Sequence, residues 1–333
     1  MTACAPLRLV VMGTGPFAVP MFAALLGSQH RVVAVVTRPA HAAPGRRPPP
    51  NPMREAAVAA NVPVLDPERV NDEESLEAVA KLAPDLLVVC DYGQILSPQA
   101  LAIAPLGGIN LHGSLLPRHR GAAPVQWAIL AGDPITGVSV IHMTPALDAG
   151  AVIVARAAPI YPRDTAAELE KLLAELGAGA TLEAIERLQA AVAVAKPGEP
   201  LTVGIPQDPA QATRAPRLTK ADGLVNWSQP AARIERMRRA LEPWPRTTAF
   251  LHRDAGPPLR LVVEELAVAA DHAAAARGAA PGTVLAADAQ GIVVACGGGT
   301  AVTIARLVPE GRRSMSAAEF LRGHPILPGM RFA

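Results

Sequence analysis

Three polar residues with side chains suited to acyl transfer are close together in the middle of the chain. Asn110 and His112 lie two residues apart in a short run that follows the breaker Pro105-Leu-Gly-Gly108 and predicts a strand. Because strand side chains alternate between faces, the amide and the imidazole are expected to point the same way. Gly113 then ends the strand, and open α/β sheets bind ligands beyond the carboxyl ends of their strands.

Asp148 follows a second predicted strand, residues 137–143, and can reach the same crevice from its loop. An amide and a protonated imidazole can stabilise an oxyanion, and a carboxylate can orient the imidazole. This set suits acyl transfer to an amine, since the attacking amine comes from the substrate and no serine or cysteine nucleophile is needed. An isolated Asn-x-His also occurs as turn and cap residues, so the three residues alone leave that interpretation open.

The composition indicates a globular protein with two domains. The chain has 333 residues, of which 50% are hydrophobic and 18% charged, and its net charge of +2 does not by itself indicate a nucleic-acid partner. Cys4, Cys90 and Cys296 are far apart and show neither metal-ligand spacing nor a disulfide framework, which fits a reducing compartment. The apolar residues 7–26 are interrupted by Gly13-Thr-Gly-Pro16, so they predict strand, turn and helix, without a signal peptide or a membrane span.

Strands and helices alternate along the first part of the chain. This alternation predicts an α/β fold with a Rossmann-like, mostly parallel, doubly wound sheet in a domain covering residues 1–192. Asn71 and Glu74 have the spacing of a capping pair for one of the helices. The predicted strands are residues 7–12, 31–37, 86–90, 109–112 and 137–143, and the predicted helices are 17–26, 53–61, 71–82 and 165–192.

The composition changes after this domain. Proline-rich stretches within residues 193–210 predict a stiff linker, and residues 211–333 predict a smaller β-barrel domain. Basic residues outnumber acidic ones in this second domain, and Arg236 and Arg239 lie on an arginine-rich helix, which predicts either a phosphate-binding patch or a solvated helix face. The predicted elements are a helix at 231–241, strands at 259–265, 282–287, 291–296 and 301–307, and a loop around the alanine run 273–276.

Several longer motifs add to this interpretation. The string from Ser114 to Pro124, which reads Ser-Leu-Leu-Pro-x-x-Arg-Gly-Ala-Ala-Pro, resembles the signature of the 10-formyltetrahydrofolate-dependent formyltransferases, especially the members that act on methionyl-tRNA. By this resemblance Asn110, His112 and Asp148 match the family's catalytic residues, and the C-terminal domain is OB-like and binds tRNA. Further motifs in the family's order are Asp91–Leu96, Leu147–Gly150, Asn226-Trp227, Pro243–Pro245 and Ser314–Gly323.

The resemblance implies an enzyme that transfers the formyl group of 10-formyltetrahydrofolate to the α-amino group of methionyl initiator tRNA, for translation initiation. We expect a cytoplasmic monomer that needs no metal and contacts no membrane. The folate donor is expected to bind the backbone of Tyr92, Gly93, Gln94 and Ile95 and to contact Ser114, Leu115, Leu116 and Pro117. The charged initiator tRNA is expected to contact Arg46, Arg47, Arg120, Arg236 and Arg239.

The sequence departs from the family in two places. Relatives typically have Gly-Thr-Pro and an acidic residue in the first turn, whereas this chain has Gly13-Thr-Gly-Pro16, and Asp91 stands where many relatives have alanine. The basic loop after the second strand is short, stiffened by proline and free of lysine, with Arg46 and Arg47 as the best matches to its basic centre.

The first turn also supports a rival function. Gly13, Gly15 and Ala18 satisfy a dinucleotide fingerprint, and Arg38 can serve a 2′-phosphate, as in an NADP-dependent oxidoreductase. The acidic ribose ligand of that fingerprint is absent and Pro16 stiffens the turn, so the formyltransferase is favoured. The remaining alternatives are a relative that formylates a sugar nucleotide or a small amine, one that hydrolyses the donor, and an inactive folate or RNA binder.

Overall fold

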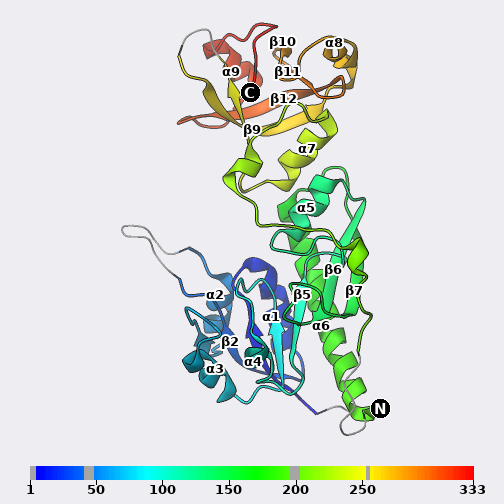
Figure 1. Cartoon of the computed structure of the whole chain (residues 1–333). Helices are drawn as coiled ribbons and strands as arrows, with labels where there is room; N and C mark the ends of the chain where they lie inside the picture. The colour runs from blue at the N-terminus through cyan, green and yellow to red at the C-terminus, as the bar shows by residue number, and fades with distance from the viewer. Residues whose placement is uncertain (1–4, 41–48, 196–202, 253–255) are drawn as a thin grey trace. The chain divides into compact units, whose positions relative to one another are not determined.

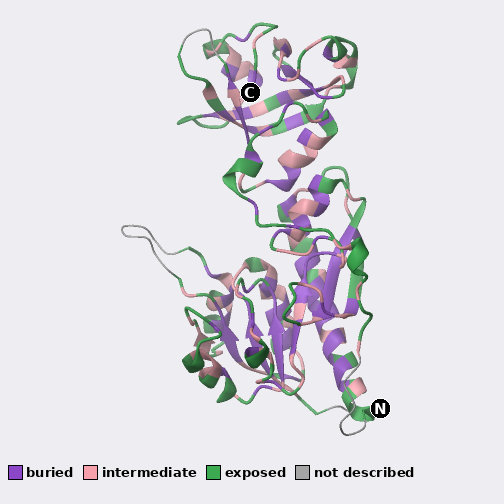
Figure 2. Cartoon of the chain, in the orientation of Figure 1, coloured by how far each residue is buried: buried purple, intermediate pink, exposed green. Residues whose placement is uncertain are grey.

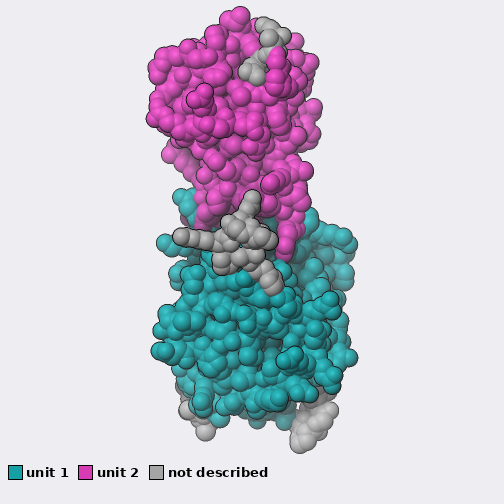
Figure 3. All heavy atoms as spheres, turned by 90° about the vertical axis from the view of Figure 1, so that its left-hand side faces the viewer, with its two compact units in different colours: residues 1–125, 134–160, 168–216 teal, residues 126–133, 161–167, 217–333 magenta. Residues whose placement is uncertain are grey.

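The chain folds into two compact units. The computed structural model describes residues 5–40, 49–195, 203–252 and 256–333 (Figure 1). Unit 1 consists of Met1–Val125, Pro134–Ile160 and Glu168–Pro216, and unit 2 consists of Gln126–Asp133, Tyr161–Ala167 and Arg217–Ala333 (Figure 3).

Unit 1 is built on a seven-stranded sheet with the strand order β3-β2-β1-β4-β5-β6-β7. Pairing is parallel from β3 to β5 and antiparallel between β5 and β6 and between β6 and β7. The prediction of a Rossmann-like, mostly parallel sheet is therefore confirmed. The strands are β1 (Arg8–Met12), β2 (Arg31–Val36), β3 (Val64–Leu65), β4 (Leu86–Val89), β5 (Gly108–His112), β6 (Ile135–His142) and β7 (Val152–Pro159).

The central strands of this sheet are buried on both faces, as Figure 2 shows. In β1, every residue from Leu9 to Met12 is at most 1% exposed, which explains its continuous apolar sequence. The strand order reverses direction between β1 and β4, and this reversal creates a crevice beyond their carboxyl ends. Ligands of such sheets bind in that crevice, so the loops that follow β1, β4 and β5 are the first place to look for a site.

Helices cover the sheet of unit 1. They are α1 (Val19–Leu26), α2 (Pro52–Ala59), α3 (Glu73–Ala80), α4 (Pro98–Leu101) and α6 (Ala166–Val194). Most of α5 (Pro124–Ala131) belongs to unit 2. Helix α6 packs on β5 and β7: Gly177 leaves room for Leu111, and the Arg187 guanidinium donates to the Ile153 carbonyl.

The predicted capping role of Asn71 is wrong. Asp72 is the N-cap residue of α3, and the Asn71 amide instead donates to the Ile95 carbonyl and accepts from the Ser97 backbone. Sequence spacing could not reveal this, because the loop that Asn71 holds lies more than 20 residues further along the chain.

Unit 2 contains a six-stranded sheet in which β10, β11, β12, β9 and β8 pair in that order and β13 pairs with β12, so the predicted smaller β domain is confirmed. The strands are β8 (Thr247–Leu251), β9 (Leu259–Val268), β10 (Val284–Asp288), β11 (Gly291–Cys296), β12 (Thr300–Pro309) and β13 (Met315–Ser316), and the helices are α7 (Ala231–Ala240), α8 (Ala273–Arg277) and α9 (Ala317–Gly323). The alanine run 273–276 was predicted to lie in a loop, and this prediction is wrong. The run forms most of α8, because alanine is the strongest helix former.

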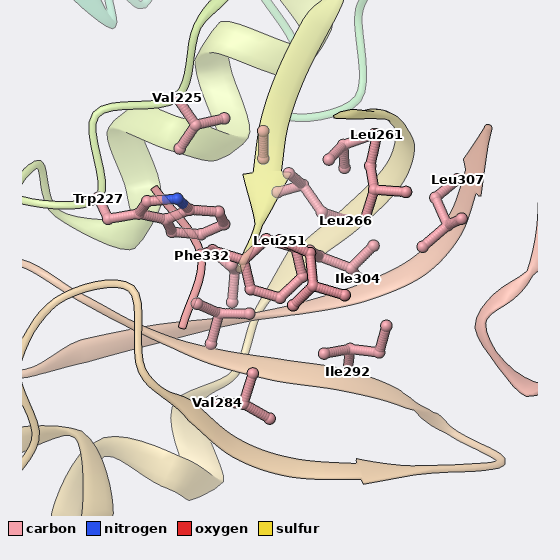
Figure 4. Close-up of a cluster of buried hydrophobic side chains, with 14 of the residues drawn as sticks. Val225, Trp227, Leu251, Leu261, Leu266, Val284, Ile292, Ile304, Leu307 and Phe332 are labelled. Carbon is pink, nitrogen blue, oxygen red and sulfur yellow. The ribbon is translucent and has the colours of Figure 1, made fainter. Parts of the chain in front are cut away.

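The core of unit 2 lies on one side of this sheet (Figure 4). Trp227 packs against Phe332 with ring centroids 5.6 Å apart, and Leu251 and Ile304 extend the same cluster. The Asn226-Trp227 motif therefore supplies a core aromatic residue, which matters in a chain where only 3% of residues are aromatic.

The described part of the predicted linker contacts unit 1. Residues 203–216 belong to that unit, and the Ile205 and Val152 backbones exchange two hydrogen bonds of 2.8 Å. The domain boundaries at 192 and 210 stay a prediction. In the described ranges, no helix is both long enough and apolar enough to cross a membrane.

Candidate active site

The carboxyl end of β5 presents Asn110 and His112. Asn110 pairs with Val89 of β4 on one side and with Ile141 of β6 on the other, so it lies at the centre of the sheet. The two side chains lie on the same face because they are two residues apart on a strand. Among the residues that the structure describes, none hydrogen-bonds the Asn110 side-chain amide, which leaves that amide available to a ligand.

The His112 ring lies between two acceptors. Its Nε2 is 2.9 Å from the carbonyl oxygen of His119, so Nε2 carries a proton and donates it. Its Nδ1 is 3.7 Å from Oδ2 of Asp148, which is an ion-pair distance but too long for a hydrogen bond. The imidazole and the carboxylate are 6% and 10% exposed. A doubly protonated ring would face an acceptor at each nitrogen, which suits a group that delivers a proton from Nδ1.

Asp148 is held in place by its own loop and by a neighbouring one. Its backbone adopts a left-handed conformation, with φ of 49°, that aspartate tolerates better than most residues. Its Oδ2 accepts a 2.9 Å hydrogen bond from the Gly121 backbone N–H, so the oxygen that faces His112 is also anchored. The structure thus brings together the three residues that the sequence predicted as catalytic, although their roles remain predictions.

Several polar groups of the loop after β5 form hydrogen bonds within the protein. The Ser114 hydroxyl donates to the Arg118 carbonyl, and the Ser114 carbonyl accepts from the Ser139 hydroxyl. Ser139 also accepts from the Leu116 backbone, so Ser114 is fully buried and serves the loop. The partly buried Leu115, Leu116 and Pro117 leave apolar surface for the expected folate contact, which stays a prediction.

Two side chains of the loop after β4, those of Tyr92 and Gln94, turn toward the protein. The Tyr92 ring is 2% exposed, and burial raises the pKa of its hydroxyl to about 12. The Gln94 amide accepts from the Val70 backbone and donates to the Pro67 carbonyl. Gly93 and Ile95 are exposed. This arrangement leaves Gly93 and Ile95 exposed for a ligand. The assignment of that ligand as the folate donor stays a prediction.

The glycines of the first turn have packing roles. A Cβ on Gly13 would lie 2.8 Å from the Cys90 carbonyl oxygen, and a Cβ on Gly15 would overlap the Asp91 carboxylate. The Thr14 backbone donates to the Asp91 carbonyl, and its hydroxyl donates to the Tyr92 carbonyl. The two departures from the family pattern, at Gly15 and at Asp91, are therefore neighbours in space, and both glycines are explained without a bound dinucleotide.

The arginines predicted to contact tRNA differ in their surroundings. Arg120 donates to Oε1 of Gln207 from Nε at 3.1 Å and from Nη2 at 2.7 Å. Arg236 is half-buried beside Gly132. Arg46 and Arg47 lie outside the described residues.

Arg239 is 6% exposed, forms an ion pair with Glu235 and donates to the Asp164 carbonyl, all within unit 2. Its placement favours a structural role, and its predicted contact with tRNA remains untested.

Gln207 and Thr213 contact the site loops, and the sequence did not indicate them. The Gln207 amide donates to the Asp148 carbonyl, and the Thr213 hydroxyl accepts from the His119 backbone. Both lie in or next to the proline-rich stretch that predicted a linker, and their partners are 59 and 94 residues away. No local spacing rule could have paired them.

The geometry places an amide, an imidazole and a carboxylate at the carboxyl edge of a Rossmann-like sheet, a set of groups that suits acyl transfer without a protein nucleophile. The Formyl transferase family model matches residues 7–185, and the model of the Formyl transferase C-terminal domain matches residues 217–325. The chain belongs to the formyl transferase family.

Close relatives share nearly the full length. The chain is 45% identical over 333 residues to the methionyl-tRNA formyltransferase of Rhodopirellula baltica, covering 98% of this chain and 96% of the relative. It is 40% identical over 321 residues to the methionyl-tRNA formyltransferase of Desulfotalea psychrophila, covering 96% and 94%.

Solved structures share the fold at low identity. The sugar 3N-formyl transferase WlaRD, solved with dTDP and 5-N-formyl-THF, has a TM-score of 0.62 and 12% identity, covering 92% of this chain and 99% of that one. HypX from Aquifex aeolicus, solved with tetrahydrofolic acid, has a TM-score of 0.55 and 16% identity, covering 95% and 47%. The family assignment replaces the rival interpretation as an NADP-dependent oxidoreductase.

Proposed function

We propose that this chain transfers the formyl group of 10-formyltetrahydrofolate to the α-amino group of methionyl initiator tRNA. The relatives that share 40–45% of its sequence over almost their whole length carry that activity in their name. The observation that carries the proposal is the convergence of His112 and Asp148, whose Nδ1 and Oδ2 atoms lie 3.7 Å apart, on the strand end where no described residue hydrogen-bonds the Asn110 amide.

The reaction forms one C–N bond and breaks another. The neutral α-amine attacks the formyl carbon, and the carbonyl oxygen becomes an oxyanion. The Asn110 amide and a protonated His112 donate to that oxygen, which stabilises the transition state more than the substrate. The C–N10 bond then breaks, and N10 of the folate leaves with a proton.

Proton transfer falls to His112 and Asp148. His112 can give its Nδ1 proton to the departing N10, because its Nε2 proton is engaged by the His119 carbonyl. The nitrogen that attacked must lose a proton in exchange. The neutral imidazole left after the first transfer can take up that proton, and the Asp148 carboxylate beside Nδ1 is placed to stabilise the imidazolium that forms. The products are the formamide on the aminoacyl end and tetrahydrofolate.

The binding assignments belong to the same proposal. The donor pairs with backbone of Gly93 and Ile95 and packs on residues 115–117, while Arg120 and the arginine-rich C-terminal domain contact the tRNA. Arg46 and Arg47 contact its aminoacyl end. We place the enzyme in the cytoplasm as a monomer; the cysteines in the described residues, Cys90 and Cys296, are buried and free, which fits a reducing compartment.

One assay tests the function. Purified protein is mixed with 10-formyltetrahydrofolate and methionyl initiator tRNA, and formyl-methionine is detected by mass after the ester is hydrolysed. We expect turnover with this acceptor and little with methionyl elongator tRNA, a dTDP-linked amino sugar or free methionine. Efficient formylation of the amino sugar or of free methionine, with tRNA ignored, would leave only the formyl-transfer chemistry standing.

A further inference from the structure

Residues 203–216, which we call the strap, run across the loops that carry the site. The strap pairs with the start of β7 through Ile205 and with the loop after β5 further on. There the Arg120 backbone donates to the Thr213 carbonyl at 2.8 Å, and the Ala215 backbone donates to the Arg120 carbonyl at 2.7 Å. All of these residues belong to unit 1.

One strap residue, Gln207, holds the Asp148 loop. Its Nε2 donates to the carbonyls of Asp148 and Gly150, both at 2.8 Å, and its Oε1 accepts from two nitrogens of Arg120. All of the hydrogen-bonding capacity of this amide is therefore used. The strap thereby joins the loop that carries Asp148 to the loop that carries His119 and Arg120.

A second strap residue, Thr213, holds the other partner of the catalytic ring. Its hydroxyl accepts a 2.8 Å hydrogen bond from the His119 backbone N–H. His119 has a φ of 59°, a left-handed conformation in which its carbonyl oxygen accepts from Nε2 of His112. Because a non-glycine residue adopts this conformation only when its surroundings hold it, the contact with Thr213 bears directly on where that carbonyl points.

We propose that Gln207 and Thr213 are positioning residues that fix the orientation and tautomer of His112 by holding the acceptors at its two nitrogens. The inference rests on the proposed function for its kinetic consequence, but its structural content is independent of the acceptor. Gln207 acts through Asp148, and Thr213 acts through the His119 carbonyl. Neither touches the reacting atoms.

The chemistry of the two side chains makes the inference specific. A glutamate at position 207 would keep the length but lose both donors and place a charge beside two carbonyl oxygens. A valine at position 213 would keep the shape but lose the acceptor, whereas a serine would keep the acceptor. The pair Thr213→Val and Thr213→Ser therefore separates the hydrogen bond from the packing.

Steady-state kinetics of four variants test the inference in the whole enzyme. We expect Gln207→Glu and Thr213→Val each to lower kcat by about 10-fold to 100-fold, since small displacements of catalytic groups have effects of that size. In Thr213→Val the KM for the tRNA should change less than about twofold, and Thr213→Ser should recover most of the lost kcat. The control is Gln211→Ala, an exposed strap residue whose amide donates to Asp208, and it should keep the wild-type kcat.

A second readout does not depend on activity. Nitrogen chemical shifts of ¹⁵N-histidine-labelled protein, with the His112 signals assigned by their loss in His112→Asn, report the tautomer of the ring. The wild type should show a protonated, hydrogen-bonded Nε2, and Thr213→Val should show a mixture of tautomers while Thr213→Ser restores the single form. If the wild type formylates nothing but these shifts behave as stated, the function is wrong and the positioning stands. If Thr213→Val and Gln207→Glu keep both the kcat and the shifts, the positioning proposal is wrong whatever the acceptor is.

Discussion

The residues of unit 1 that were predicted to be catalytic and the arginine helix α7 of unit 2 were both predicted as functional from clustered polar residues, yet their surroundings in the structure differ. At the end of β5, the Asn110 amide and Nδ1 of His112 are left without a hydrogen bond from the described residues. On α7, two guanidinium groups are engaged by the fold: Arg233 donates to the Leu130 carbonyl and Arg239 to the Asp164 carbonyl.

The difference comes from what each element must satisfy. The backbone N–H and C=O groups of a strand inside a sheet are hydrogen-bonded to its neighbours, so polar side chains at the end of the strand are not needed to satisfy them. The last carbonyls of a helix have no partner within the helix, and basic side chains commonly satisfy them. Arg233 does this at the C-terminal end of α5, so an arginine cluster can signal helix packing as readily as phosphate binding.

The largest effect is expected at His112. In the proposed mechanism, His112→Ala removes the group that donates to the oxyanion and to the leaving nitrogen, so kcat should fall by a factor on the order of 10² or more. The circular-dichroism spectrum and melting temperature should stay near the wild-type values. The matched control is His252→Ala, an exposed histidine of unit 2, which should leave kcat within about twofold of wild type. Near-normal turnover in His112→Ala would remove the imidazole from the mechanism.

Gly121 should show the second-largest effect, because it combines strain with a contact to Asp148. Its φ is +129°, and a Cβ there would overlap the Ala215 carbonyl oxygen of the strap. We expect Gly121→Ala to destabilise unit 1 by about 1–3 kcal/mol and to lower kcat at least about 10-fold, as the N–H that holds Asp148 shifts. Urea denaturation and kinetics measure the two effects. Gly179→Ala, in α6 where nothing lies within 4 Å, is the control and should be neutral or stabilising.

Much of the fold could be predicted because its signals are local. The continuous apolar runs of β1 and β4 and the breakers around β5 locate the central strands within one or two residues. Strand β7 was missed because its sequence, Val-Ile-Val-Ala-Arg-Ala-Ala-Pro, has a charged residue and small residues in its second half, where an edge strand faces solvent. The alternation of elements was enough for the fold class but not for every member of the sheet.

The site divides in the same way. Asn110 and His112 were predictable because two-residue spacing on a strand fixes a shared face. Gln207 and Thr213 were not, since hydrogen bonds across 59 and 94 residues of chain leave no trace in local composition. The proline-rich sequence around Gln207 predicted an extended segment, and an extended segment can cross a domain's surface as well as connect two domains.

Arg239 and Arg217 of unit 2 allow an arginine that stabilises the fold to be compared with one that is exposed and available to tRNA. Arg239 is buried with Glu235, so Arg239→Ala should destabilise unit 2 by about 2 kcal/mol, the cost of leaving charged hydrogen-bonding groups unpaired. Arg217 is exposed, and Arg217→Ala should change stability by less than about 0.5 kcal/mol.

For tRNA binding we expect the opposite order of effects, with Arg217→Ala having the larger effect and Arg239→Ala the smaller. If Arg217 contacts phosphate, its loss flattens the dependence of log affinity on log salt by about one unit, while Arg239→Ala leaves that slope unchanged in the folded protein. A lower slope for Arg239→Ala, measured where the variant is fully folded, would show that its guanidinium reaches the nucleic acid after all.

The smallest effect is expected from His142, a histidine of β6 outside the catalytic set. Burial lowers the pKa of His142 below its usual value of 6.5, against a smaller raising effect of a hydrogen bond with the Val203 backbone. Because the folded-state pKa is the lower one, the unfolded chain binds more protons between the two values, and stability rises with pH across that window. The contribution of neutral His142 to stability is therefore complete above pH 6.5 and is lost as the pH falls from 6.5 toward the folded-state pKa.

The urea midpoint of the wild type should therefore be lower at pH 5.5 than at pH 7.5. The decrease between these two pH values should be smaller in His142→Gln. His252→Gln, which removes an exposed histidine, should reproduce the wild-type slope. An unchanged slope in His142→Gln would assign the acid sensitivity to other groups, with His30 the first to examine because burial lowers its pKa as well.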